Sequence, residues 1–264
     1  MQKFIPLTKI TEKNIFLEKL RNFAYGISGI IEILIILGLW FILFGKTSIL
    51  GGFTRQEIIA YLLLGNLISI INSYILYKII NHDLVSPGSK MLVLKPIRYF
   101  FHIIKNGFSK YFLNFLILII FDLILIYFLI EDFTFHFDLN YILVILVITI
   151  LAFVIEFLLA YLANLYIFWI IDSSDLYKII IRLKNFLSGS YFPLSLMPAI
   201  YLNISLLLPF AYSFFVPTQL YLKKIDLSTG LVGILIQIFW IIILYLIIKI
   251  AWKRKSQKFS TSQK

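Results

Sequence analysis

The fold is decided by the stretch Tyr141–Ile155, whose sequence is YILVILVITILAFVI. It contains no charged residue, and its apolar residues follow one another without the alternation of apolar and polar positions that a strand of a membrane barrel shows. Backbone polar groups find no water to bond in the core of a bilayer, so a single crossing segment must satisfy them within itself. The stretch therefore predicts a transmembrane helix.

Apolar runs of this kind recur along the whole chain. Of its 264 residues, 61% are hydrophobic, 17% are aromatic and only 14% are charged, whereas a soluble domain is usually nearer half apolar and a quarter charged. A helix needs about 20 apolar residues to cross a bilayer. We therefore predict an all-α integral membrane protein with six transmembrane helices. Their predicted ranges are Phe23–Phe44, Glu57–Ile80, Tyr111–Ile130, Tyr141–Ile171, Leu183–Ile200 and Leu231–Trp252.

Glycine and proline interrupt the chain around the fifth predicted helix. Ser188-Gly189-Ser190 lies inside that helix, and the segment that follows it, Tyr201–Gly230, is apolar but contains two further prolines. Irregular backbone is tolerated at membrane depth only where protein or water satisfies it. We therefore expect Tyr201–Gly230 to form an outer re-entrant hairpin instead of a full span. The prolines that mark this region are Pro193, Pro198, Pro209 and Pro217.

The distribution of Lys and Arg predicts the orientation, because these residues concentrate on the cytoplasmic side of membrane proteins. With both termini inside, all but four of the 24 Lys and Arg residues fall in inner segments. The four that fall outside are Lys46, Arg55, Lys223 and Lys224. The loop Glu131–Asn140 has acids and no Lys or Arg, as an outer loop can. Both termini are therefore predicted to be cytoplasmic.

These assignments divide the chain into three parts. Residues 1–22 are predicted to be a cytoplasmic amphipathic segment, because their basic residues are interspersed with apolar ones and no signal-peptide core is present. Residues 23–252 form the transmembrane domain, and residues 253–264 form a basic cytoplasmic tail. The net charge of +11 is then explained by topology and by attraction to anionic membrane lipids, and no nucleic-acid partner is expected.

The motifs of the common hydrolytic chemistries are missing from the sequence. It has no G-x-x-x-x-G-K-[ST] phosphate loop, no H-E-x-x-H and no G-x-S-x-G, and it contains no cysteine. The histidines His82, His102 and His136 are scattered without the spacing of metal ligands. We therefore expect no catalytic residues, no metal and no cofactor bound by this chain.

Three acids fall within predicted helices and are the candidate transport-path or gating residues. They are Glu32, Asp122 and Glu156. A charge in the centre of a bilayer costs about 2.5 kcal/mol or more, so such residues face protein or water. Glu156 shares a helix face with Ala152 and Ala160, and small residues of this kind commonly mediate helix packing in membranes. Packing and a transport role both remain open for these acids, whereas the stripe Gly65, Ser69 and Ser73 is assigned to packing.

The basic loop at residues 81–110 is longer than a turn between two helices requires. Pro87-Gly88 predicts a turn at its centre, and apolar residues follow it up to Lys95-Pro96. Leu84 and Leu92 are the apolar anchors, and protein interfaces commonly place such anchors within a charged rim. The loop is therefore predicted to dock on another protein. The alternative is that its charges hold it against anionic lipid.

Two stretches resemble the ABC-2 type exporter permeases, and more narrowly the bacterial subgroup described by domain of unknown function 990. The first is Pro87–Tyr99, with the sequence PGSKMLVLKPIRY, although Ser89-Lys90 departs from the acidic or glycine residue usual there. The second is Phe186–Pro198, with the sequence FLSGSYFPLSLMP, followed by Leu208–Tyr212 and Val216-Pro217. The resemblance extends over essentially the whole chain.

The resemblance implies the permease subunit of an ATP-binding-cassette exporter in the bacterial cell membrane. It further implies a dimer of two identical or related permease chains. A separate ATP-binding subunit would bind the ATP, and a groove on that subunit would receive the loop at residues 81–110. The proline-rich hairpin would then shape the exit on the outer side. The alternatives from other classes are a membrane-embedded enzyme acting on lipid-linked substrates and a membrane assembly protein without transport activity.

Overall fold

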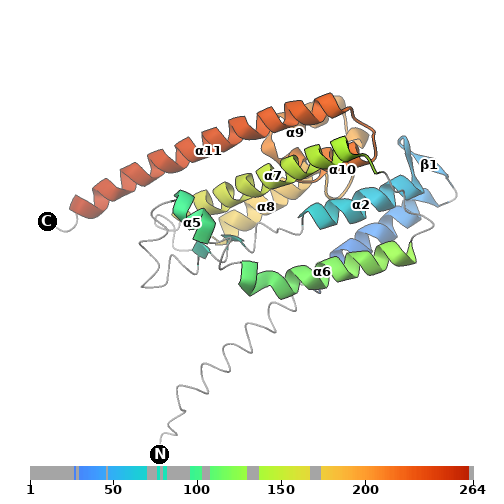
Figure 1. Ribbon diagram of the computed structural model, residues 1–264, viewed down its shortest axis with the longest axis horizontal. Helices are drawn as coiled ribbons and strands as arrows, with labels where there is room; N and C mark the ends of the chain where they lie inside the picture. Colours follow the sequence, from blue (N-terminus) through green and yellow to red (C-terminus); the bar gives the residue numbers. More distant parts are fainter. Residues whose placement is uncertain are drawn as a thin grey trace, which may run out of the picture.

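The described part of the chain is almost entirely helical (Figure 1). The computed structural model describes residues 27, 30–45, 47–69, 76–77, 80–81, 96–102, 108–129, 137–166 and 174–261. Its helices are an unlabelled helix at Ile30–Phe44, α2 (Arg55–Ser69), α5 (Pro96–His102), α6 (Phe108–Phe128), α7 (Leu139–Tyr166), α8 (Ser174–Ser188), α9 (Ala199–Leu207), α10 (Phe215–Tyr221) and α11 (Leu227–Thr261). Two 3-10 turns, η3 (Leu194–Leu196) and η4 (Pro209–Ser213), flank α9. The predicted all-α class is confirmed for the described residues, apart from a two-stranded antiparallel hairpin of β1 (Ile49–Leu50) and β2 (Phe53–Thr54).

Among the described residues, two helices have the length and composition of membrane spans. They are α7, over Leu139–Leu165, and α11, over Leu227–Ala251. Most of their residues are not buried within the protein, as expected of helices that face lipid. The Ile30–Phe44 helix and the Ile119–Phe128 part of α6 are shorter apolar helices. The remaining predicted spans extend into residues outside the described ranges or are interrupted.

Helices α7 and α11 lie side by side and run in the same direction (Figure 1). Gly230, near the start of α11, faces Val144, near the start of α7. One turn further along α7, the amide of Gln237 donates to the backbone oxygen of Ile148 at 3.0 Å. We call the end of the bundle where both helices begin the hairpin end, because β1 and β2 lie there, and the opposite end the α5 end.

The predicted fifth helix, Leu183–Ile200, is wrong as a continuous segment. The structure places α8 earlier, at Ser174–Ser188, and ends it at Gly189, whose φ of 80° suits a residue without a side chain. Pro193 and Pro198 then precede η3 and α9 and prevent the helix from continuing. The basic residues between Lys178 and Lys184, expected in a loop, therefore belong to an amphipathic helix.

The residues after α8 fold into short helices packed within the protein. The chain breaks at Pro209, as predicted, where α9 ends and η4 begins. The predicted break at Pro217 is wrong, because this proline lies in the first turn of α10, where its missing N–H has no intrahelical partner to lose. Residues 211–220, which include most of α10, are all buried.

The core consists of two clusters of buried side chains. At the hairpin end, the ring of Tyr61 on α2 contacts the ring of Phe53 on β2 and the ring of Phe214, the residue just before α10. At the α5 end, Tyr99 of α5 and Tyr161 of α7 lie buried with their ring centroids 6.2 Å apart. The two clusters together hold the short helices against α7 and α11.

Ion pairs tie the loops together at the hairpin end. Lys224 Nζ lies 2.9 Å from Glu57 Oε1, and Lys223 Nζ lies 3.2 Å from Asp138 Oδ2. The Lys223 hydrogen bond lowers the pKa of Asp138, which also accepts from the backbone N–H of Asn140 at the start of α7. Lys223, Lys224 and Asp138, which the charge distribution assigned to the outer side, thus lie at one end.

Several predicted segments lie outside the described residues. These are the amphipathic segment at residues 1–22 and most of the loop at residues 81–110. Helix α11 continues to Thr261, so it extends through most of the segment predicted as a basic tail, residues 253–264.

Candidate functional site

A buried ion pair joins α7 to α8. Lys184 Nζ donates to Glu156 Oε1 at 2.6 Å, and the two side chains are only 10% and 8% exposed. Lys184, which was counted among the inner basic residues near the start of the predicted fifth helix, lies on the buried face of α8, because α8 begins earlier than expected. Nothing in the sequence pattern relates the two residues. The tertiary structure brings them together.

The face of α7 that carries Glu156 is packed against protein, as the small residues beside it predict. Ala152, Ala160 and Ala163 are all buried. Two turns beyond Glu156, the amide of Asn164 donates to the backbone oxygen of Tyr77 at 3.2 Å and to that of Ala160 at 2.8 Å. Glu156 Oε2 is buried and has no hydrogen-bond partner among the described residues. Within the described part of the chain, Glu156 is therefore bonded through Oε1 alone.

A second buried carboxyl lies between α2 and α6. Asp122 is fully buried, and Asn66 Nδ2 donates to its Oδ1 at 3.0 Å and its Oδ2 at 2.8 Å. The predicted packing of the Gly65 stripe on α2 is confirmed at two positions. Gly65 lies against the ring of Phe214, and Ser69 Oγ donates to the backbone oxygen of Ser213 at 3.3 Å. Asp122 and Glu156 therefore belong to two separate polar contacts.

The third acid, Glu32, is placed differently. Its side chain is exposed on the surface of the Ile30–Phe44 helix. The single chain therefore does not enclose Glu32. Only two of the three acids predicted for a transport path lie inside the bundle.

The predicted docking loop, residues 81–110, is described in part, chiefly at α5. Leu84, Pro87, Gly88, Leu92 and Lys95 lie outside the described residues, whereas Pro96 is the first residue of α5. Proline is favoured at this helical position because its φ angle is preset and no hydrogen bond is lost.

Helix α5 is held against α7 by aromatic side chains. The ring centroid of Phe100 lies 4.9 Å from that of Phe157, and the rings meet edge to face. Tyr99 is fully buried beside Phe157 and Tyr161. The sequence analysis did not identify this contact, although the run Tyr99-Phe100-Phe101 was a signal that could have indicated it. The end of the loop is thus packed on the part of α7 that carries Glu156.

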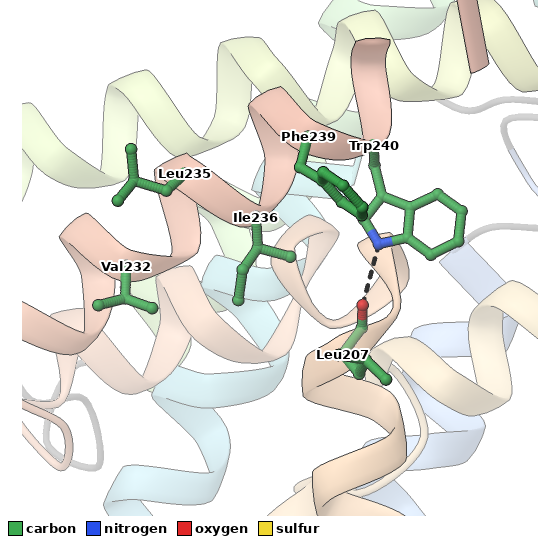
Figure 2. A pocket seen from close by; sticks show the side chains of 6 residues that line it. All are labelled: Leu207, Val232, Leu235, Ile236, Phe239 and Trp240. Atoms are coloured by element: carbon green, nitrogen blue, oxygen red, sulfur yellow. Dashed lines mark hydrogen bonds between the residues drawn. The ribbon is translucent and has the colours of Figure 1, made fainter. Parts of the chain in front are cut away.

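Figure 2 shows an apolar groove between the end of α9 and one face of α11. Its volume is about 410 Å³, and its lining consists of Leu207, Val232, Leu235, Ile236, Phe239 and Trp240. The indole N–H of Trp240, the polar group in this lining, donates to the backbone oxygen of Leu207 at 2.9 Å. The lining side chains therefore present no free polar group that could select a ligand.

Comparison with known families identified one match. A family model described as ABC-2 family transporter protein matches residues 30–263 of the chain. The comparisons with curated proteins and with solved structures found no match.

Proposed function

The chain belongs to the ABC-2 family of transporter proteins, and from this we propose that it is the permease subunit of an ATP-binding-cassette exporter, powered by a separate ATP-binding subunit. The observation that carries the proposal is the family match across residues 30–263. The two long apolar helices, α7 and α11, support it, since most of their surface is not enclosed by this protein. The sequence has no phosphate loop of its own, so ATP would be bound by the partner.

The loop at residues 81–110 is the proposed contact with the ATP-binding subunit. Leu84 and Leu92 would be its apolar anchors, and Lys95 would belong to its charged rim. The packing of α5 supports this role, because Tyr99 and Phe100 join the end of the loop to α7. A movement of the loop would then act on the helix that carries Glu156, and through Lys184 on α8.

The short helices between α8 and α11 are proposed to form the outer re-entrant hairpin. Three observations support this: the break at Pro209, the burial of α10, and the ion pairs that join Lys223 and Lys224 to the hairpin end. Both termini are proposed to lie in the cytoplasm of a bacterial cell, and the charge distribution supports this orientation. Two identical or related permease chains would form the complete transport pathway. We also propose that the chain belongs to the subgroup described by domain of unknown function 990.

Co-purification of the tagged chain with an ATP-binding subunit tests the proposal. Membranes of the native host should yield a complex of the two proteins. The ATPase activity of the ATP-binding subunit should differ between this complex and the isolated subunit. The Leu84→Asp, Leu92→Asp double variant should insert normally but lose the ATP-binding subunit.

A matched control removes charge from the same loop. If the loop only rests on anionic lipid, Lys90→Gln, Lys95→Gln and Arg98→Gln should matter more than the two leucine changes. Retained binding and transport in the leucine double variant would exclude the loop as the contact. A wild-type chain that recovers no ATP-binding subunit would contradict the proposed function itself.

A further inference from the structure

Helix α8 differs in composition from the other long helices. Its sequence, SDLYKIIIRLKNFLS, has several charged residues, of which Lys178 and Arg182 are exposed and Lys184 is buried, whereas the spans of α7 and α11 are predominantly apolar. A helix with a strong polar face, Lys and Arg on that face and large apolar residues beside it is typical of a segment that lies at the boundary between lipid tails and headgroups. α8 nevertheless packs alongside α7 within the bundle (Figure 1).

The buried face of α8 fixes which residues point outward. Tyr177 stacks on Tyr77 with ring centroids 4.3 Å apart, and Lys184 pairs with Glu156. At the end of the helix, the hydroxyl of Tyr61 donates to the backbone oxygen of Gly189 at 2.6 Å. Contacts at the start, middle and end of α8 therefore prevent it from rotating about its axis.

The exposed face carries a basic row beside an apolar row. Lys178 and Arg182 are exposed and lie one turn apart. Next to them, Ile179 and Leu183 are 62% and 53% exposed, and Phe186 continues the face by one further turn at 45%. From Lys178 to Phe186 the face extends about 12 Å along the helix. Its polarity thus changes from basic to apolar toward the hairpin end.

Aromatic side chains close the apolar end of this face. The ring centroid of Phe186 lies 5.3 Å from that of Tyr201 and 5.8 Å from that of Phe192, edge to face in both cases. The hydroxyl of Tyr201 donates to the backbone oxygen of Phe186 at 2.8 Å. The hydroxyl is thus engaged, and the rings form the apolar end of the face.

The ion pair also sets the depth of the basic row. Glu156 lies about 13 Å from the end of the apolar span Leu139–Leu165, at 1.5 Å per residue. Lys184 is at the level of Glu156, so Lys178 and Arg182 lie roughly 9 Å and 3 Å nearer the α5 end. A 27-residue span is about 10 Å longer than the hydrocarbon core. Lys178 therefore reaches the headgroup boundary, and the long Arg182 side chain can extend to it.

We propose that the exposed face of α8 binds an anionic membrane lipid, with its phosphate at Lys178 and Arg182 and an acyl chain along Leu183 and Phe186. Charge complementarity selects the headgroup, and the apolar row continues in the direction an acyl chain takes away from the headgroup boundary. The site goes beyond the proposed function and does not depend on it, because lipid binding is measured on the chain alone.

Native mass spectrometry of the full chain, released from nanodiscs of equimolar phosphatidylglycerol and phosphatidylcholine, tests the proposal. Wild-type chain should retain phosphatidylglycerol in preference to phosphatidylcholine. The Lys178→Gln, Arg182→Gln double variant should lower that preference by roughly thirtyfold, since each direct hydrogen-bonded contact to the phosphate contributes about 1 kcal/mol. Leu183→Gln should also lower retention, because the acyl chain loses its apolar contact.

The matched control removes two charges from the α5 end of α11. The Lys249→Gln, Lys253→Gln variant should keep the preference for phosphatidylglycerol, and Lys178→Arg should keep it too. Equal retention of both lipids by wild type, or loss of the preference in the α11 control, would overturn the site. Displacement of the lipid by excess inorganic phosphate would show a headgroup site only and would overturn the acyl-chain assignment. Unchanged retention of phosphatidylglycerol by the Lys178, Arg182 double variant would overturn the phosphate site.

Discussion

The buried pair of Lys184 and Glu156 makes a sharp prediction about stability. Glu156→Gln keeps the size and shape of the side chain but removes its charge, so the ammonium of Lys184 loses the carboxylate that lies 2.6 Å away. Removing one member of a buried ion pair costs about 3–5 kcal/mol, because the other charge stays desolvated without its partner. In a chain of this size each kcal/mol lowers the melting temperature by about 2–4 °C, so a fall of roughly 6–20 °C is expected.

The assay is thermal unfolding of the purified chain in neutral detergent, with the folded fraction measured by size exclusion after heating. Glu32→Gln is the matched control, because Glu32 is exposed on the single chain and the chemical change is the same. That control should melt within about 2 °C of wild type, since exposed substitutions usually change stability by no more than about 0.5 kcal/mol.

A second variant separates the pair from the packing around it. Replacing both residues, as Glu156→Gln with Lys184→Met, removes the two charges together and should recover most of the lost stability, because apolar replacements of buried pairs are often neutral. The losses of stability in the single variants Glu156→Gln and Lys184→Met should therefore add up to more than the loss in the double variant, by about 1 kcal/mol or more. Additive losses in the double variant, or an unchanged melting temperature for Glu156→Gln, would refute the reasoning.

Two further predictions concern packing and pH. Gly65→Ala would place its Cβ 2.1 Å from the buried ring of Phe214 and should cost about 1–3 kcal/mol, whereas Gly38→Ala, with nothing within 4 Å, should be neutral or stabilising in the same melting assay. Equal effects of the two alanines would contradict the close approach. The pKa of Asp138 is lowered in the folded state, so its bond to Lys223 adds stability above the ordinary carboxyl pKa and loses it as the pH falls below about 4. Lys223→Gln should therefore reduce the acid-side loss of melting temperature, and an identical pH profile would exclude the contribution.

The helical class and several breaks could be predicted from local features. Long uncharged runs such as Tyr141–Ile155 can satisfy their backbone in a membrane only as helices, and α7 includes this range. Pro209 ends a helix because proline lacks the N–H that the preceding turn requires, as the structure bears out. Pro217 shows the limit of the same rule, since its effect depends on where the helix begins, and contacts of α10 with α2 and α7 decide that.

The polar contacts inside the bundle could not be predicted, because each joins residues far apart in the sequence. Lys184 was only counted among the inner basic residues, yet it lies directly beside Glu156 in space, although the two are 28 positions apart in the sequence. Asn66 and Asp122 are 56 positions apart. A charge pattern indicates that a buried acid needs a partner, but it does not identify the residue that supplies it.

The sequence by itself determined that this is a helical membrane protein, where its apolar segments lie, and that proline and glycine interrupt the region between α8 and α11. These properties follow from the transfer of side chains and backbone out of water, which each segment experiences on its own. Only the tertiary structure decided that α8 begins at Ser174, that Glu156 faces Lys184 and that Glu32 remains exposed. Those outcomes depend on which helix faces meet, and a close contact between two helices is a property of both surfaces together.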